Sequence, residues 1–589
     1  MSATFIDGEA LGKKQLYSLM TDSNKRSIFN KHGLTFREIT KFLLESSTKL
    51  VFIYGANYDF TNWINASSKL RRLFRNSKNE GRSITVGELK ISYIPSKLFV
   101  ISKGHHTLVA VWDLCNFMQT SFINALEKAS LPIPENILRG KAARGTFQLK
   151  DLEEVKTYSL KECELGLRLT NQLLDALAQS GIKLRNYYGA ASIGKWFLRR
   201  YKVHDHYPKL MPYGARRASK YAFYGGRIEI LKRGQFKQAH SIDFVSAYPH
   251  CAMSLPCLRH GSWLKLAQAK DIKLLSSTTP AMVRVKWKCA DRLVGPLPYR
   301  DTRGSLSYPL EGEAWHHWIE VFEAIRLFGA SSFDLKEAYV WRQTCNHKPF
   351  EAMISHLYKM RESASSYIMN TVFKIALNST YGVTSQHPIG TSRSPFYELF
   401  YAGMITASTR ARLLRTLNDS KIPDNQIISF ATDNIKTIEP LSMLTVKTLG
   451  GQEVNTHKSL IMLEAGVWQD SEQTKTRGFG KIRLTPILKV LQHQQKRFGQ
   501  DTPAEAPIQN CKMLMTLKQG ARRHKPELTG KIITVERVVR WYPYDEKRIW
   551  FTNKDSTPHL NSNAPLSAMY SPSALSVQEY RSAHRGLLL

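Results

Sequence analysis

Hydrophobic and polar positions along the chain predict a mixture of strands and helices. In the first 180 residues, short apolar runs at 50–54, 98–101 and 107–111 have the composition of β-strands. Between residues 162 and 180, leucines recur at helical spacing, and the pattern ends before Gly181. Strands and helices are therefore expected to share the N-terminal part of the chain, with a boundary near residue 180.

Beyond that boundary the pattern predicts isolated strands between helices. Strands are expected at 227–231, 239–244 and 426–430, and helices at 195–202 and 402–417. Residues 350–377 have a helical pattern without proline, and the serines at 363–366 are expected to divide it into an antiparallel pair. A basic region follows residue 499, and the tail at 557–589, rich in Ser, Pro and Asn, is expected to be poorly ordered.

Charge and length narrow the class of protein. The 589 residues suffice for several domains, and 84 basic against 48 acidic side chains give a net charge of +36. Such an excess predicts a polyanionic partner, with nucleic acid as the first candidate. No apolar run is long enough to span a bilayer, and the first residues lack the blocks of a signal peptide. We therefore expect an intracellular protein without a membrane partner.

The seven cysteines suit a reducing compartment. None forms a Cys-x-x-Cys pair, which argues against a zinc ribbon. A bridge between Cys251 and Cys257 is the less favoured alternative, because disulfides are rare in the cytosol.

Two apolar strands each lead into an aspartate. Asp243 ends the strand at 239–244 and precedes Ser246 and Tyr248, while Asp433 follows the strand at 426–430. A carboxylate at a strand end can hold a divalent cation while the next backbone N–H groups face phosphate oxygens. Taken alone, Asp243 could equally cap the next helix and Asp433 could belong to a polar turn. Taken together, two carboxylates can hold the two Mg²⁺ ions of nucleotidyl transfer, which activate a 3′-hydroxyl and stabilise pyrophosphate.

A third motif lies between them. Lys374 and Asn378 are four residues apart, and Tyr381 is seven from Lys374, so a helix places all three near one face. A cation, an amide and a ring on one face suit a triphosphate and a base pair, and the lysine can neutralise developing charge or protonate pyrophosphate. The alternative is a helix that ends at Gly382 and carries a solvated lysine.

Two acids near the N-terminus form a second candidate site. Asp7 and Glu9 are two apart on an expected strand, so their side chains point to the same side and can both reach metal ions. The plain alternative is a pair of solvated acids.

In chain order, the segments around Asp243, Lys374 and Asp433 resemble motifs A, B and C of family B DNA polymerases. Lys374 follows Asp243 by 131 residues, and Asp433 follows Lys374 by 59 residues. The run Ala222-Phe223-Tyr224-Gly225-Gly226-Arg227 resembles the Tyr-x-Gly-Gly element of the protein-primed branch found in viruses, phages and linear plasmids. The resemblance implies an α+β fold, a multidomain right-hand polymerase with palm, fingers and thumb and an N-terminal RNase H-like α/β exonuclease domain.

The resemblance also implies roles for single residues. Asp243 and Asp433 would bind the polymerase metals, with Lys374 as the catalytic cation. Nucleotide contacts are expected from Ser246, Tyr248 as the steric gate against a 2′-hydroxyl, Arg361, Lys374, Asn378 and Tyr381. DNA contacts are expected from Gly225, Gly226, Lys475 and Arg477. Ala431 stands where the family usually has an aspartate, so we expect an active but slower polymerase.

Three N-terminal segments resemble the exonuclease motifs of proofreading polymerases. They are Asp7-Gly8-Glu9, Asn57-Tyr58-Asp59 and Tyr158 with Glu162. The resemblance implies that Asp7, Glu9, Asp59 and Glu162 hold two metal ions that activate water, with Tyr158 beside them. The spacing around Asn57 is compressed, and Glu162 replaces the usual aspartate.

The same resemblance predicts the domain order and the partners. The expected parts are the exonuclease (1–180), first palm segment with an insertion (181–346), fingers (347–382), second palm segment (383–498), thumb-like region (499–556) and tail (557–589). Expected partners are a primer-template DNA, dNTPs, Mg²⁺ or Mn²⁺ and, for a protein-primed enzyme, a terminal protein. We expect a monomer that works in a host cytoplasm or an organelle matrix.

Two other functions remain open at this point. The chain could be an exonuclease whose polymerase site is impaired at Ala431, or a non-catalytic nucleic-acid-binding protein on a polymerase fold. The joint presence of Asp243, Tyr248, Lys374, Asn378 and Asp433 argues against the non-catalytic alternative, whereas primer-extension and degradation assays are needed to separate the exonuclease from an active polymerase.

Overall fold

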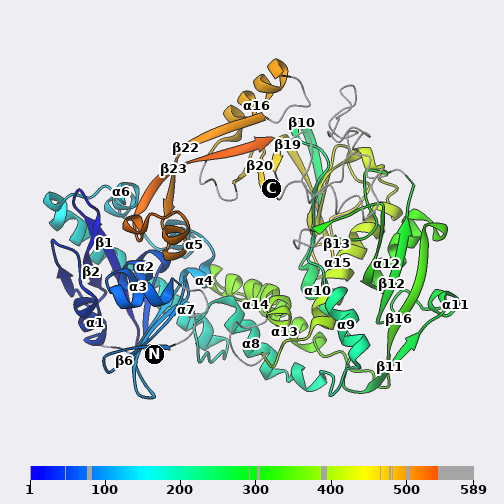
Figure 1. Cartoon of the computed structure of the whole chain (residues 1–589), viewed down its shortest axis with the longest axis horizontal. Helices are drawn as coiled ribbons and strands as arrows, with labels where there is room; N and C mark the ends of the chain where they lie inside the picture. The colour runs from blue at the N-terminus through cyan, green and yellow to red at the C-terminus, as the bar shows by residue number, and fades with distance from the viewer. Residues whose placement is uncertain are drawn as a thin grey trace. The chain divides into compact units, whose positions relative to one another are not determined.

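The computed structural model describes residues 2–541, except 47, 49, 76–82, 291, 301–305, 387–393, 465, 477–478, 480–481 and 499–503. The tail at 557–589 and Arg477 lie outside the described residues. The chain divides into two compact units (Figure 1). The first contains residues 1–200, 355–395 and 512–535, and the second contains residues 201–354, 396–511 and 536–589.

The first unit is built on an eight-stranded sheet in the order β3-β2-β1-β4-β8-β7-β6-β5. Its strands are β1 (Thr4–Leu11), β2 (Leu16–Asp22), β3 (Ser27–Phe29), β4 (Leu50–Ile53), β5 (Ser83–Val86), β6 (Leu89–Ile94), β7 (Leu98–Lys103) and β8 (His106–Asp113). β4 runs parallel to both β1 and β8, and the other pairs are antiparallel. The strands expected at 50–54, 98–101 and 107–111 are confirmed.

Helices cover both faces of this sheet. Helices α1 (Phe36–Leu44), α2 (Asn57–Asn65) and α3 (Ser68–Phe74) share a core with Ile6 and Val51. On the other face α7 (Leu152–Gln179) packs against β1 and β2. A Cβ added at Gly166 of α7 would lie 2.3 Å from Cε1 of Phe5, so glycine is needed for this approach. The helix expected at 162–180 is confirmed and begins ten residues earlier, at Leu152.

The first unit also contains the helices expected between residues 350 and 377. Helix α13 (Glu351–Glu362) ends before α14 (Tyr367–Ser385), and the Ser366 hydroxyl caps α14 by accepting the Met369 N–H at 3.1 Å. The division of this segment at its serines is thus confirmed. Because α14 continues to Ser385, the interpretation of Gly382 as the residue that ends the helix is wrong.

Helix α8 (Ala190–Arg200) packs on α14, where the Ser379 hydroxyl donates to the Ala190 carbonyl at 3.2 Å. Shorter helices α4 (Cys115–Met118), α5 (Phe122–Lys128) and α6 (Glu135–Ala143) join β8 to α7. Residues 512–535 add α17 (Leu517–Arg522), and the Asn62 amide of α2 donates to the Gly530 carbonyl at 3.0 Å.

The second unit is built on a seven-stranded sheet in the order β21-β20-β19-β10-β18-β17-β9. Its strands are β9 (Arg227–Ile230), β10 (Gly234–Phe244), β17 (Ile427–Thr432), β18 (Asn434–Thr437), β19 (Gln452–Glu464), β20 (Val467–Gln469) and β21 (Thr474–Thr476). The strands expected at 227–231, 239–244 and 426–430 are confirmed. Ile242 and Phe244 of β10 face a core shared with α15 (Leu399–Asp419), so alternation places Ser241 and Asp243 on the opposite face.

The same unit contains a second sheet, whose strands come after β10 in the sequence. Its order is β11-β16-β12-β15, and its strands are β11 (Gly261–Leu266), β12 (Ala281–Lys288), β15 (Glu311–His317) and β16 (Phe333–Gln343). A short pair, β13 (Tyr299–Arg300) and β14 (Leu306–Ser307), lies between β12 and β15 in sequence. The helices of this unit are α9 (Tyr213–Tyr221), α10 (Ala247–Met253), α11 (Ala269–Lys273), α12 (Trp318–Phe328), α15 and α16 (Leu484–Phe498).

The basic region after residue 499 contains β22 (Ala504–Leu514), which pairs with β23 (Ile532–Trp541). The six-part division into functional domains stays a prediction, because the two compact units divide the chain at other positions. No helix in the described part of the chain is both long and apolar enough to cross a membrane.

Candidate active sites

Strands β10 and β18 bring the two strand-end aspartates together. Asp243 pairs in register with Asn434, and the Phe244 N–H donates to the backbone carbonyl of Asp433 at 3.1 Å. Because β17 and β18 form a hairpin whose turn contains Asp433, this carboxylate lies beside the end of β10. The convergence that the sequence predicted for these two residues is confirmed.

Burial of Asp433 and its repulsion by Asp243 both disfavour the charged Asp433 carboxylate, and a bound cation would offset them. Burial raises the pKa of Asp433 to about 6, and the negative charge of Asp243 adds to the effect. Asp243 itself is exposed at the end of its strand. A divalent cation between the two would offset their repulsion, and Mg²⁺ prefers such oxygen ligands while it keeps several waters.

The residues that flank the two carboxylates adopt unusual backbone conformations. Ser246 has a φ of 49° and Thr432 a φ of 66°, a region that side chains other than glycine rarely occupy. Such positions cluster at functional sites, where surrounding structure holds them. Ser246 is also the residue that caps α10, so the interpretation of Asp243 as the cap of that helix is wrong.

The Gly-Gly element lies against this site. A Cβ added at Gly226 would lie 2.7 Å from the Tyr248 hydroxyl oxygen and 2.9 Å from Cγ2 of Thr432. A larger residue at this position would therefore displace the side chains of Tyr248 or Thr432. The structure thus groups Gly226 and Tyr248 with the carboxylates, as the resemblance implied.

A buried ion pair holds the Gly-Gly element in place. Arg410 of α15 donates to the backbone carbonyls of Tyr224 at 3.1 Å and Gly225 at 2.5 Å. The same guanidinium forms a two-pronged bond with Glu320 of α12, at 2.7 and 2.9 Å. Both side chains are at most 2% exposed. Sequence reasoning missed this pair, because one arginine among 84 basic residues carries no local signal.

A cavity of about 360 Å³ adjoins the carboxylates within the second unit. Its lining includes Asp243, Ala431, Asp433, Lys436, Trp468 and Lys475. The ammonium groups of Lys436 and Lys475 lie 4.8 and 5.1 Å from the centre of the Trp468 ring. The cavity therefore offers positive charge beside the carboxylates, and Lys475 contributes to it.

Lys436 is the residue of this cavity that sequence reasoning missed. Burial and, to a smaller extent, the charge of Lys475 lower its pKa to about 8, whereas Asp243 acts in the opposite direction. The neighbouring His457 makes two hydrogen bonds. Its Nε2 bonds with the Ser241 hydroxyl at 2.9 Å, and its Nδ1 bonds with the Asp470 carboxylate at 2.8 Å. His457 Nε2 lies 3.4 Å from the Lys436 ammonium, so this network positions the lysine.

The residues of motif B lie together on two helices of the first unit. Lys374 and Asn378 are exposed on α14, Tyr381 is half-buried one turn further on, and Arg361 lies on α13. The helical face that the sequence predicted is present. Lys374, Asn378 and Tyr381 share α14, Arg361 lies on the preceding helix, and Asp243 and Asp433 belong to the second unit.

A second acidic cluster lies in the first unit, between β1 and α7. Carboxylate oxygens of Asp7, Glu9 and Glu162 all lie within 4.8 Å of one another, and all three residues are buried. The Tyr158 hydroxyl donates to Glu162 at 2.6 Å. The solvated-acid alternative for Asp7 and Glu9 is therefore wrong, because both are at most 3% exposed.

Asp59 lies on α2 beside β1, outside this group of three acids. Its Oδ1 accepts the Tyr17 hydroxyl at 2.8 Å, and a Cβ added at Gly8, between Asp7 and Glu9, would lie 2.8 Å from the same oxygen. Burial raises the pKa of Asp59 to about 7. Asp7, Glu9 and Glu162 are thus gathered in one place, whereas Asp59 lies beside Gly8 and is held by Tyr17, so its grouping with the other three acids stays a prediction.

Two cations that sequence reasoning missed neutralise part of the cluster's charge. Arg144 donates to Glu9 at 2.8 Å and to Asp7 at 3.1 Å, and Lys141 pairs with Glu162. Burial, followed by the charge of Glu162, raises the pKa of Asp7. Burial opposes ionisation of Glu162 as well, but Lys141 and Arg144 hold its pKa below the usual value. This excess of buried negative charge is what divalent cations would neutralise, so the donor set fits a metal site.

A larger cavity of about 950 Å³ in the second unit combines cations with aromatic rings. Its lining includes Arg217, Lys220, Tyr221, Arg300, Trp315 and Tyr339. Cations interleaved with rings suit the phosphates and bases of a single strand. Part of the large positive charge of the chain is therefore concentrated at a concave surface.

Comparison with known proteins identifies the relatives of this chain. Residues 172–398 match the family described as DNA polymerase type B, organellar and viral. No curated protein sequence matches the chain. Phi29 DNA polymerase in complex with primer-template DNA and incoming nucleotides superimposes with a TM-score of 0.62 at 12% identity, over 92% of this chain and 99% of that one. The same polymerase with single-stranded DNA gives a TM-score of 0.61 at 13% identity, over the same shares of the two chains.

These matches agree with the motifs and with the fold described above. The expected mixed α+β fold is confirmed: it matches the fold of the multidomain phi29 DNA polymerase and includes an N-terminal sheet domain. Residues 172–398 are therefore similar in sequence to the organellar and viral type B DNA polymerases, and nearly the whole chain has the fold of phi29 DNA polymerase.

Proposed function

We propose that this protein is a template-directed DNA polymerase that adds dNTPs to a 3′-hydroxyl by two-metal nucleotidyl transfer. The observation that carries the proposal is the pairing of β10 with the β17–β18 hairpin, which places Asp243 and Asp433 side by side at a cavity. Metal ions bound there would activate the primer hydroxyl and stabilise the leaving pyrophosphate. The match of residues 172–398 to type B polymerases supports the same function.

The side chains around the carboxylates have distinct tasks in this proposal. Asp243 and Asp433 bind and orient the Mg²⁺ ions, and Tyr248, against Gly226, excludes the 2′-hydroxyl of a ribonucleotide. Lys374, Asn378, Tyr381 and Arg361 bind the incoming nucleotide together with Ser246. Lys475, Arg477 and the Gly-Gly element contact the primer-template.

The buried acidic cluster supports a second activity, a 3′→5′ exonuclease. Asp7, Glu9, Asp59 and Glu162 would hold two ions, with Tyr158 fixing the orientation of Glu162 through its 2.6 Å bond. Because Arg144 and Lys141 already neutralise part of the charge, both must shift or share the carboxylates when ions bind. The protein would then remove misincorporated nucleotides as well as add correct ones.

The biological setting follows from the same branch of the family. We propose that the protein replicates a viral, phage or plasmid genome as a monomer, that a terminal protein supplies the first hydroxyl, and that Mn²⁺ can replace Mg²⁺. Replication places it where dNTPs are made, in a host cytoplasm or an organelle matrix.

Primer extension tests the polymerase activity. Purified protein with a primed template, four dNTPs and Mg²⁺ should extend the primer to the template end in the order that the template specifies, and should not extend it with ribonucleotides. Omission of one dNTP should stop extension at the first position that needs it. Mg²⁺-dependent degradation without any extension would support the alternative of an exonuclease with an impaired polymerase site. DNA binding without either reaction would support the alternative of a non-catalytic nucleic-acid-binding protein.

Removal of two buried acids should abolish the exonuclease. The double variant Asp7→Ala with Glu9→Ala loses the two β1 ligands, so digestion of a 3′-labelled single strand with Mg²⁺ should slow by about 10²-fold or more. The matched control, Glu153→Ala with Glu154→Ala, removes two exposed acids from the helix that carries Glu162 and should digest the strand at the wild-type rate. An unchanged rate in the Asp7 and Glu9 variant would show that another site cuts the strand.

A further inference from the structure

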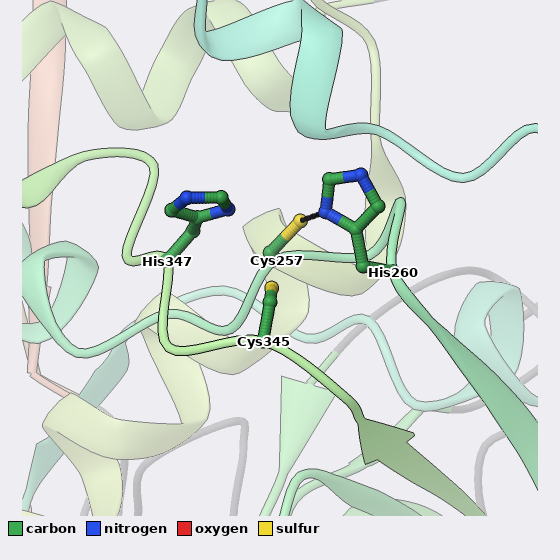
Figure 2. Close-up of side chains that lie close together, drawn as sticks. All are labelled: Cys257, His260, Cys345 and His347. Atoms are coloured by element: carbon green, nitrogen blue, oxygen red, sulfur yellow. Dashed lines mark hydrogen bonds between the residues drawn. The ribbon is translucent and has the colours of Figure 1, made fainter.

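Four side chains with metal-ligand chemistry converge in the second unit, and none of them takes part in the sites described above. The sulfur atoms of Cys257 and Cys345 and one imidazole nitrogen each of His260 and His347 all lie within 4.8 Å of one another. Figure 2 shows that they come from two separate segments of the chain. The group has two thiols and two imidazoles and contains no carboxylate.

The second sheet brings the two segments together. Cys257 and His260 lie just before β11, while Cys345 and His347 lie just after β16. Antiparallel pairing matches the start of β11 with the end of β16, and it continues as a bond from the Thr344 N–H to the His260 carbonyl at 3.0 Å. The Cys257 N–H donates to the His347 carbonyl at 3.2 Å. The backbone therefore fixes both pairs of side chains at the same end of this sheet.

A glycine makes this close approach possible. Gly261, the first residue of β11, has a φ of 152°, and a Cβ there would lie 2.2 Å from the carbonyl oxygen of Arg342. Any other residue would push β11 away from β16 beside the four side chains. The convergence thus depends on a particular backbone contact and not only on the side-chain rotamers.

Hydrogen-bond donors surround the two sulfurs, although burial raises the pKa of the Cys257 thiol. The backbone N–H groups of Arg259 and His260 donate to Cys257, and the N–H of His347 donates to Cys345. The Gln343 amide nitrogen lies 3.3 Å from the sulfur of Cys345, and Nδ1 of His206 lies 3.4 Å from that of Cys257. Donors directed at sulfur stabilise its charged form, and such an outer layer of hydrogen bonds orients the ligands of a metal.

The spacing of the ligand atoms suits a tetrahedral ion. With metal–sulfur and metal–nitrogen bonds of about 2.3 and 2.0–2.1 Å, the sulfur and nitrogen of a tetrahedral site are about 3.5 Å apart. The distance between Sγ of Cys257 and Nδ1 of His260 is 3.5 Å. The other pairs, at up to 4.8 Å, need only small side-chain rotations to close on the ion.

We propose that Cys257, His260, Cys345 and His347 bind one structural Zn²⁺ ion. Two sulfurs and two imidazole nitrogens form the ligand set typical of structural zinc, and softer thiolate ligands disfavour Mg²⁺ and Ca²⁺. Four protein ligands leave no open position, so the ion does not take part in chemistry. On binding, the two thiols release their protons and two Zn–S bonds form. The missing Cys-x-x-Cys spacing excludes a four-cysteine ribbon, but it leaves this Cys-x-x-His and Cys-x-His combination open.

The ion would join parts of the second unit that sequence separates. Cys257 follows α10, the helix that begins close to Asp243 and carries Tyr248, whereas Cys345 and His347 follow the last strand of the second sheet. Zinc would therefore fasten the inserted sheet to the segment behind the polymerase carboxylates. This role is independent of whether the protein extends primers.

Metal analysis of the full-length protein tests the proposal. Protein purified without chelators from zinc-supplemented cells should contain about one zinc per chain, and the variants Cys257→Ser and Cys345→Ser should contain less than about a tenth of that amount. The control Cys511→Ser changes a half-buried cysteine outside the cluster and should keep its zinc. Zinc-stripped wild-type protein should bind Co²⁺ with the visible bands and thiolate charge-transfer absorption of a tetrahedral sulfur–nitrogen site.

The cobalt spectrum of the wild type decides the case even if the serine variants do not fold. Wild-type protein without zinc and without the cobalt bands would overturn the proposal. A wild-type mass two hydrogens below the all-thiol value, with Cys257 linked to Cys345 in a peptide digest, would also overturn it. Full zinc content in a folded Cys345→Ser variant would assign the metal to other residues.

Discussion

Replacing Asp433 with asparagine should abolish primer extension and, at the same time, make the protein more stable. The amide keeps the size of the side chain but removes the charge that binds the metal, so we expect the extension rate to fall by about 10³-fold or more. Stability should rise because the charged Asp433 carboxylate destabilises the folded protein, in which its pKa is raised to about 6.

The sign of the stability effect follows from the direction of the pKa shift. The pKa is about 6 in the folded protein and near the ordinary 3.8 when unfolded, so the folded state binds the proton more tightly. The penalty for the charged form therefore grows as the pH rises from about 4 to 6 and is complete above pH 6. It amounts to about 2–3 kcal/mol, which the asparagine removes at neutral pH. The gain in apparent melting temperature should be a few degrees at pH 8 and should shrink as the pH falls toward 4.

A matched control separates this effect from a general effect of removing negative charge. Asp334 is an exposed carboxylate on β16 that pairs with Lys336, so Asp334→Asn should change neither extension nor the melting temperature. Extension by Asp433→Asn at the wild-type rate would remove this residue from the metal site. A melting temperature that falls instead of rising would mean that the carboxylate makes a stabilising contact.

Removing the guanidinium of Arg410 should destabilise the second unit by about 3–5 kcal/mol. Arg410→Leu leaves Glu320 buried without a partner and frees the carbonyls of Tyr224 and Gly225. The pKa of Glu320 is about 2 in the folded protein, because the charges of Arg410 and His316 outweigh the opposing effect of burial. Without the arginine this carboxylate should take up a proton on folding. Denaturant unfolding monitored by tryptophan fluorescence measures the loss.

Two further variants make this prediction specific. Arg415→Leu lies on the same helix, but Arg415 is half-exposed and its partner Glu323 also pairs with Arg326, so the cost should stay within about 1 kcal/mol. The double variant Arg410→Leu with Glu320→Met replaces the buried pair by apolar side chains and should recover much of the stability. If Arg410→Leu unfolds at the wild-type denaturant concentration, the Gly-Gly element is held by other contacts.

The charge balance at the polymerase carboxylates has a consequence for metal affinity. Ala431 lines the cavity where related enzymes usually have a further acid, and Lys436 adds a buried cation whose charge acts on Asp243. Both features weaken the negative potential that attracts Mg²⁺. The proposed polymerase is therefore expected to need more Mg²⁺ than an enzyme with the usual acidic pair, which agrees with the slower rate expected from the sequence.

Local patterns in the sequence predicted most of the elements that carry the sites. The apolar runs that end at Asp243 and Asp433 and the serines between α13 and α14 were sufficient to place these residues on two strand ends and one helix. Alternation along β1 placed Asp7 and Glu9 on one face, where the structure finds both. These predictions succeeded because strand and helix periodicity depends on neighbours within a few residues.

The residues that sequence reasoning missed depend on contacts between distant segments. Arg144, Lys436 and Arg410 are single cations among many, and only folding distinguishes them by burying them next to carboxylates. In the sequence, the strands of the second sheet lie between the pair Cys257 and His260 and the pair Cys345 and His347, so no short motif contains all four residues. The pairing of β11 with β16 supplies what the sequence pattern lacks.

Diffraction from a complex with Mn²⁺ tests the central claim most directly. Crystals of the protein with primer-template and a non-reactive dNTP analogue should show anomalous peaks about 2.0–2.3 Å from carboxylate oxygens of Asp243 and Asp433, next to the triphosphate. Anomalous density that lies away from both carboxylates, with the nucleotide bound elsewhere, would contradict the account of this site as the place of nucleotidyl transfer.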